Sequence, residues 1–118
     1  MTSLIACISA GKGTWAHVAR LIEEHEWDSI FLITNDFGKK NFKPTKKAEF
    51  IVIDSTTFLP ELTEELRSKL AGKITDTEVA LNFVSGNGKE HMALLSAVLK
   101  LGLGIRLTAL TTEGVKEL

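Results

Sequence analysis

Two short loops of this sequence combine glycine with lysine and with small polar side chains, a composition suited to holding an anion. The first is SAGKGT, in which Gly11 and Gly13 flank Lys12 and Thr14 follows. The second is SGNGKEH, which begins at Ser85. Glycine lets the backbone approach a ligand closely, and the N–H groups at the start of a following helix favour negative charge. Both loops are therefore candidate phosphate sites.

The first loop is too short for the nucleotide-binding loop of P-loop enzymes. That motif, G-x-x-x-x-G-K-[ST], needs a glycine where this chain has Ala6 and a hydroxyl residue where it has Gly13. The dinucleotide motif G-x-G-x-x-G is also incomplete, because Ala16 stands at its third glycine. A simpler strand-to-helix turn remains, and its lysine points either toward a ligand or into solvent.

The second loop offers side chains for direct contact with a nucleotide. Asn87 can hydrogen-bond ribose or phosphate, Lys89 supplies charge, and His91 can donate a hydrogen bond to a phosphate. The competing interpretation of His91 is a capping or exposed residue in the first turn of a helix. Lys89, His91 and Lys12 are the candidate catalytic residues, with no metal and no cofactor. The predicted ligand-binding residues are Ala10, Gly11, Lys12, Gly13, Thr14, Asn35, Ser85, Gly86, Asn87, Gly88 and Lys89.

The elements that must position these loops alternate between apolar strands and helices. Apolar runs predict strands at 4–9, 29–34, 49–54, 79–84 and 104–111, and helical spacing predicts helices from residue 15, at 60–72 and at 90–101. Residues 1–118 should thus form one α/β domain, a Rossmann-like three-layer sandwich with a mainly parallel five-stranded sheet in the order 3-2-1-4-5. The switch point of that order lies between the first and fourth strands, so the two glycine loops should share one crevice.

Composition narrows the class of partner. The 14 basic and 15 acidic residues nearly cancel, so no global basic field draws the chain to duplex nucleic acid. The lone Cys7 lies in an apolar run, which suits packing in a reducing compartment. No apolar stretch is long enough to span a bilayer. We therefore expect a soluble, cytoplasmic protein without membrane contacts.

The lysine-rich segment GKKNFKPTKK has two interpretations. Charged connecting segments are usually solvated. Alternatively the segment is a flap, in which Lys39, Lys40 and Asn41 reach phosphate while Phe37 or Phe42 stacks on a base. The sequence leaves both interpretations open.

The second loop and the start of its helix, SGNGKEHM, resemble the CARF family, the Rossmann-like sensor domains that recognise cyclic oligoadenylates in CRISPR immunity. The loop of that family runs roughly T-G-G-T-K-x-M before an apolar helix. Ser85 stands for the first threonine, Gly86 for the first glycine and Lys89 for the lysine. The chain departs from the motif at Asn87 and Gly88, and its methionine falls one place late.

The resemblance implies a homodimer whose ligand, a cyclic oligoadenylate or another adenine nucleotide, lies across the two-fold axis. The chain would then act in CRISPR defence as a sensor or as a ring nuclease. In a ring nuclease, Lys12 or Lys89 would stabilise the developing charge and His91 would be the general base. The apolar helix at 90–101 supports a dimer independently, because it has few polar side chains for a solvent face. Two alternatives stay open: a mononucleotide-binding protein of another Rossmann-like family, and a dimeric interaction module without catalysis.

Overall fold

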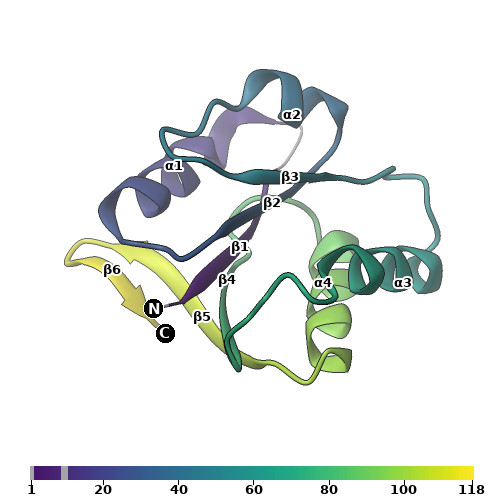
Figure 1. The fold of residues 1–118 in the computed structure, drawn as a ribbon. Helices are drawn as coiled ribbons and strands as arrows, with labels where there is room; N and C mark the ends of the chain where they lie inside the picture. Colours follow the sequence, from purple (N-terminus) through teal and green to yellow (C-terminus); the bar gives the residue numbers. More distant parts are fainter. Residues whose placement is uncertain (1, 9–10) are drawn as a thin grey trace.

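The computed structural model describes residues 2–8 and 11–118, and within them it contains a six-stranded sheet flanked by helices (Figure 1). The strands are β1 (Ser3–Cys7), β2 (Ile30–Thr34), β3 (Glu49–Val52), β4 (Glu78–Asn82), β5 (Gly104–Thr111) and β6 (Gly114–Glu117). The helices are α1 (Trp15–Glu24), preceded by the short 3-10 helix η1 (Lys12–Thr14), then α2 (Asp36–Asn41), α3 (Leu59–Leu70) and α4 (Gly88–Lys100). None of the described helices is both long and apolar enough to cross a bilayer.

The strand order is β3-β2-β1-β4-β5-β6, and the first five strands in this order are parallel. This confirms the α/β, Rossmann-like class and the predicted order of five strands. The predicted number of strands is wrong, because β6 adds an antiparallel sixth strand beside β5. Gly114 takes a φ of 100°, which lets the chain reverse directly after β5. Val115 is the single large apolar residue within the four residues of β6, so the apolar pattern that marks a strand is weak there.

Two cores lie on opposite faces of the sheet. Successive residues of a strand point to opposite sides, and in β1 Leu4 and Ala6 pack with α1, whereas Ile5 and Cys7 pack with α3 and α4. Figure 1 shows the same division, with α1 and α2 on one face and α3 and α4 on the other. Cys7 is a buried core residue, and burial raises the pKa of its thiol well above the usual range.

Helix α4 buries one side and exposes the other. Its inner residues are fully buried in the core beneath α3 and α4: Ala93, Leu94, Ala97 and Val98. On the outer side Met92 is 58% exposed and Leu99 is 60% exposed. The core of the domain thus covers the inner apolar residues of this helix and leaves Met92 and Leu99 exposed.

Candidate functional site at the carboxyl edge of the sheet

The loops that follow the parallel strands gather at one edge of the sheet. Residues 11–14 follow β1, Asn35 follows β2, Asp54 follows β3, and Ser85 follows β4. Because β1 and β4 pair directly, the two glycine loops leave neighbouring strands, as the predicted order required. Ala10, which was predicted to contact the ligand, lies outside the described residues.

The loop at residues 11–14 starts α1 without a side-chain cap. Thr14, which precedes α1, makes no capping hydrogen bond through its side chain. A Cβ atom added to Gly11 or Gly13 would meet nothing within 4 Å, so there is open space beside the loop. The Lys12 ammonium lies 5.9 Å from the ring centre of Trp15 and 6.0 Å from that of Phe37. Positive charge and aromatic rings therefore meet at this loop.

A hollow of about 600 Å³ opens between the ends of β2 and β3, and none of residues 11–14 lines it. The Phe37 ring is 43% exposed and lies 6.0 Å from the Trp15 ring, so it connects the hollow to the glycine loop. Hydrogen bonds from the Thr56 hydroxyl and amide to Asp54 Oδ1 hold the pKa of Asp54 below its usual range, which keeps it anionic. The residues that line the hollow are Asn35, Asp36, Phe37, Val52, Ile53, Asp54, Ser55 and Glu65.

This position differs from the crevice that the strand order predicted, which was between β1 and β4. Among the described residues predicted to bind the ligand, Asn35 alone lines the hollow, and its side chain also caps α2 by accepting a hydrogen bond from the Gly38 amide at 2.9 Å. Among the described residues, no three His, Cys, Asp or Glu side chains are grouped so as to hold a metal ion.

The second glycine loop is held by its own hydrogen bonds. The Asn87 side chain accepts from the Glu90 amide at 2.9 Å, while the Glu90 carboxylate accepts from the Asn87 amide at 3.0 Å, which forms a capping box at the start of α4. The Lys89 ammonium donates to the carbonyl of Ser55 at 2.8 Å. Lys89 therefore joins the start of α4 to the rim of the hollow, where Ser55 lies.

His91 also has a structural partner. Its Nε2 atom lies 2.8 Å from the carbonyl oxygen of Ser85, and its ring stacks on Phe83 with centres 4.9 Å apart. A carbonyl only accepts, so Nε2 carries the proton and Nδ1 would be the basic atom. Gly86 has a φ of 101°, and a Cβ there would approach both Cys7 and His91 Nε2 to 3.0 Å. The loop thus packs tightly against the end of β1.

A polar network that joins α1, β4 and β5 was not predicted from the sequence. The Asn82 amide group donates to the Thr108 carbonyl at 2.8 Å and to His17 Nε2 at 3.2 Å, and its oxygen accepts from the Val84 amide. His17 Nε2 also accepts from the Leu110 amide at 3.3 Å, and burial lowers the pKa of His17. These two side chains make hydrogen bonds with backbone groups of β5 beyond the point where β4 ends. The sequence signal is an asparagine within the apolar run VALNFV.

The structure of α2 and of the residue after it excludes one part of the flap hypothesis, the stacking of Phe42 on a base. Phe42 is 4% exposed and packs edge-on against Trp15, with ring centres 5.5 Å apart, so Phe42 is a core residue and cannot stack on a base. Phe37 is the exposed ring of the pair. The Asn41 side chain donates to the Phe37 carbonyl at 2.8 Å, within the helix. Lys39 and Lys40 remain exposed.

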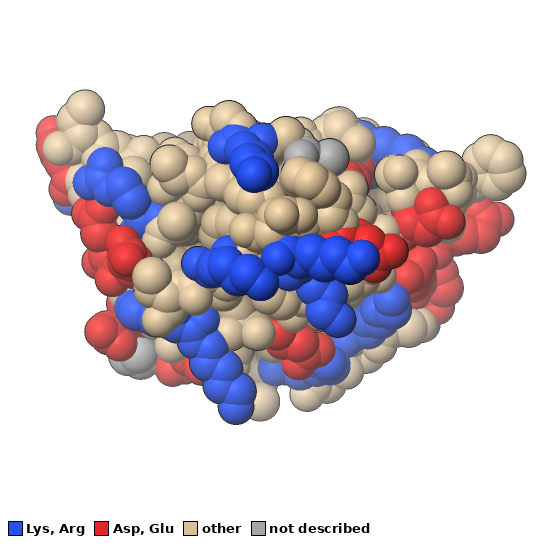
Figure 2. All heavy atoms as spheres, turned by 90° about the horizontal axis from the view of Figure 1, so that it is seen from above, with Lys and Arg blue, Asp and Glu red and all other residues tan. Residues whose placement is uncertain are grey.

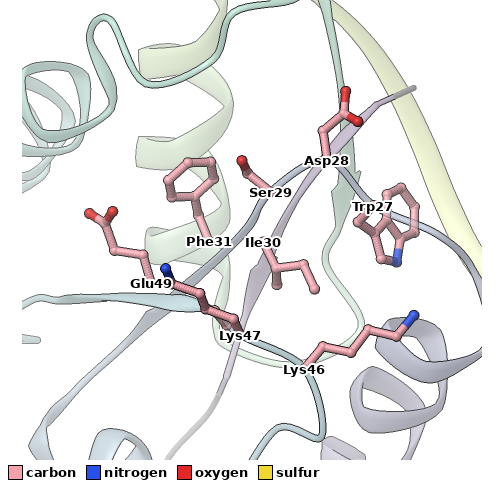
Figure 3. A pocket seen from close by; sticks show the side chains of 9 residues that line it. Trp27, Asp28, Ser29, Ile30, Phe31, Lys46, Lys47 and Glu49 are labelled. Atoms are coloured by element: carbon pink, nitrogen blue, oxygen red, sulfur yellow. The ribbon is translucent and has the colours of Figure 1, made fainter.

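A second hollow, of about 640 Å³, lies at the opposite edge, where β2 begins and the chain leads into β3 (Figure 3). Its polar groups are partly used for structure: the Lys46 ammonium donates to the His25 carbonyl at 2.9 Å, and Glu49 pairs with Lys73. In Figure 3 its charged side chains point in different directions and do not converge on one centre. It is lined by Trp27, Asp28, Ser29, Ile30, Phe31, Lys46, Lys47, Ala48 and Glu49, none of which was predicted as a site residue.

Comparisons with known proteins add little to this geometry. No protein-family model matches the chain, and no curated protein matches it. One solved structure that resembles it is the FMN-dependent cysteine decarboxylase TvaF from thioviridamide biosynthesis. The two chains share 15% sequence identity, the match covers 89% of each chain, and the TM-score is 0.33. A likeness of this strength does not transfer flavin binding or decarboxylation to the present chain.

The expected function as a sensor or ring nuclease for cyclic oligoadenylate is not borne out: no family model matches the chain, and the solved structure named above is a flavin-dependent decarboxylase. Each side chain assigned to ring cleavage also has a partner of its own within the fold. Lys12 lies against Trp15, Lys89 is bonded to Ser55, and His91 is bonded to Ser85. We conclude that the chain has a Rossmann-like fold with a candidate site at the carboxyl edge and that no family is assigned to it.

Proposed function

We propose that this chain binds a small ligand of the mononucleotide class, in which a phosphate is linked to an aromatic ring. The observation that carries this proposal is the position of the Lys12 ammonium, 6.0 Å from the exposed ring of Phe37, beside the hollow between β2 and β3. Charge for a phosphate and an aromatic face for a ring are thus adjacent. A hollow of about 600 Å³ is within the size range of small-ligand sites.

The distribution of charge suggests how such a ligand would lie. Asp36, Asp54 and Glu65 line the hollow, so it repels a phosphate and suits hydroxyl groups that donate to carboxylates. The phosphate would lie instead at residues 11–14, beside Lys12 and the open space around Gly11 and Gly13. The aromatic ring would stack on Phe37, with the hydroxylated linker toward Asp54.

The second glycine loop has a supporting part in this proposal. Lys89 donates to the carbonyl of Ser55, which lines the hollow, and so fixes the rim of the site. Lys89 is accordingly proposed as a positioning residue. Replacing it should weaken binding less than replacing Phe37.

The test is calorimetric titration of the intact chain with AMP and with FMN, two ligands of this class with different rings. Phe37→Leu should weaken binding by about 1–3 kcal/mol, roughly 5- to 150-fold, which is typical for loss of base stacking on an aromatic ring. Lys12→Ala should weaken it by about 1.5–3 kcal/mol, the usual size of a hydrogen bond to a charged group. Lys116→Ala is the matched control, since Lys116 is exposed on the distant strand β6.

The proposal fails if neither ligand binds the wild-type chain, or if Lys116→Ala weakens binding as much as Lys12→Ala does. It also fails if Phe37→Leu binds as tightly as the wild type while remaining folded by circular dichroism.

A second candidate, homodimerisation through α4, is favoured by the exposed residues Met92 and Leu99. They are seven positions apart and therefore lie on the same side of the helix, pointing away from the core. Sedimentation equilibrium should show a dimer for the wild type and a monomer for Leu99→Glu. Thr112→Glu, on the exposed turn before β6, should leave the dimer intact. A wild-type monomer at all concentrations would contradict this candidate.

A further inference from the structure

Positive charge is concentrated in one segment of the chain. Residues 36–47 contain five lysines and one aspartate, a local net charge of +4, while the remaining residues carry −5 and the whole chain −1. The segment comprises α2 and the loop toward β3. Seen from above, a row of blue side chains crosses the middle of the molecule, with red side chains at both sides and below it (Figure 2). The net charge of the whole chain is therefore near zero although this segment is strongly basic.

Four of these lysines lack an acidic partner. Among the described residues, no ion pair joins Lys39, Lys40, Lys43 or Lys47 to a carboxylate, and all four are exposed. The fifth, Lys46, donates to a backbone carbonyl. The chain pairs most of its other cations, in ion pairs that involve Arg20, Arg67, Lys69, Lys73 and Arg106. The four lysines, which we call the lysine surface, repel one another until an anion neutralises them.

The backbone that carries the lysine surface is fixed to the core. Phe42 is buried against Trp15, and the Asn35 side chain caps α2. Gly38 lies so close to β2 that an added Cβ would overlap the Thr34 hydroxyl, which itself donates to a backbone carbonyl of the core. The lysines therefore lie on a helix and a loop that are packed against the sheet.

We propose that the lysine surface binds the backbone of single-stranded nucleic acid. Sites for single strands combine positive charge that follows the phosphates with an aromatic side chain on which a base can stack. Phe37 provides the exposed ring on the same helix as Lys39 and Lys40. A duplex would have no unpaired base to place on this ring. A lipid surface would require several exposed apolar side chains, and Phe37 is the one large exposed apolar residue between positions 36 and 47.

This inference goes beyond the proposed function, because the lysines act outside the hollow and need no ligand in it. The two share Phe37 alone. Binding of a strand and binding of a mononucleotide can therefore be separated with variants that change only the lysine surface.

The experiment follows the fluorescence anisotropy of a labelled oligonucleotide of about 12 residues, a length that matches typical single-strand sites. With four phosphates neutralised, log K should fall with log salt at a slope of about −3. Lys43→Ala combined with Lys47→Ala should reduce the magnitude of this slope to about half. The control, Lys100→Ala combined with Lys116→Ala, removes the same charge from α4 and β6 and should leave the slope unchanged.

The Lys43/Lys47 double variant should keep the wild-type affinity for AMP and FMN, which distinguishes a failure of this inference from a failure of the proposed function. The inference is overturned if the single strand does not bind at low salt, or if the control pair weakens binding equally. Equal affinity for a duplex of the same sequence would also overturn it, as would tighter binding to vesicles of anionic lipid than to the strand.

Discussion

Replacing Asn82 by alanine should lower the free energy of unfolding by about 3 kcal/mol. Asn82 is 2% exposed and lies at the end of β4, where its side-chain amide makes three hydrogen bonds, one each with Thr108 of β5, His17 of α1 and Val84. Each bond contributes about 1 kcal/mol to stability, and the loss leaves the Thr108 carbonyl without this donor. The expected loss is a large part of the stability of a domain of this size.

The assay is urea denaturation followed by the fluorescence of Trp15 and Trp27. Asn82→Ala should lower the midpoint without changing the dependence on urea, since the surface exposed on unfolding is the same. His17→Ala removes two of the hydrogen bonds in the network, and one of them is shared with Asn82. The double-mutant cycle should therefore give a coupling of about 0.5–1.5 kcal/mol.

Two results would refute this reasoning. A loss below about 1 kcal/mol for Asn82→Ala would mean that the three bonds contribute little together. Strict additivity with His17→Ala would mean that the bond between these two side chains does not stabilise the folded chain. Thr112→Ala, at an exposed turn position, is the control and should change the midpoint little.

Three further predictions follow from individual side chains. Burial lowers the pKa of His17 below its usual value of 6.5, so near that pH the folded chain binds fewer protons than the unfolded chain. The free energy of unfolding should therefore fall as the pH drops from 6.5 through the folded pKa. In urea titrations at several pH values, His17→Gln should reduce this dependence on pH. Gly38→Ala should destabilise the chain by about 1–3 kcal/mol in thermal melts through overlap with Thr34, whereas Gly13→Ala, with open space around it, should not. Cys7 should react with a thiol reagent only on unfolding, because burial keeps its pKa high; rapid reaction of the native chain would contradict its place in the core.

The fold was predictable because the apolar pattern reflects burial directly. Continuous apolar runs marked the central strands, and β5 begins and ends at the expected residues, 104 and 111. Strand β6 was missed because a four-residue edge strand with one large apolar side chain resembles a polar tail. Its pairing depends on the turn at Gly114, and that conformation is visible only in three dimensions.

The edge of the sheet that carries the candidate site was predictable, but the position of the hollow along that edge was not. Strand order was enough to bring the two glycine loops to one edge of the sheet. Whether Lys89 contacts a ligand or a carbonyl depends on how close Ser55 lies, 34 residues away in the chain. The bond between His17 and Asn82 spans 65 residues, so no local pattern contains it. The hollow beside Phe37 likewise arises from the packing of β2, β3 and α2.

The central claim, a mononucleotide site at the carboxyl edge, is tested most directly by recording amide NMR spectra of the isotope-labelled chain during titration with AMP and FMN. We expect the largest shifts at residues 11–14 and at Phe37, with smaller shifts around Asp54. Shifts concentrated at the opposite edge, in the hollow lined by Trp27 and Phe31, would contradict the account. A spectrum that neither ligand changes would contradict it as well.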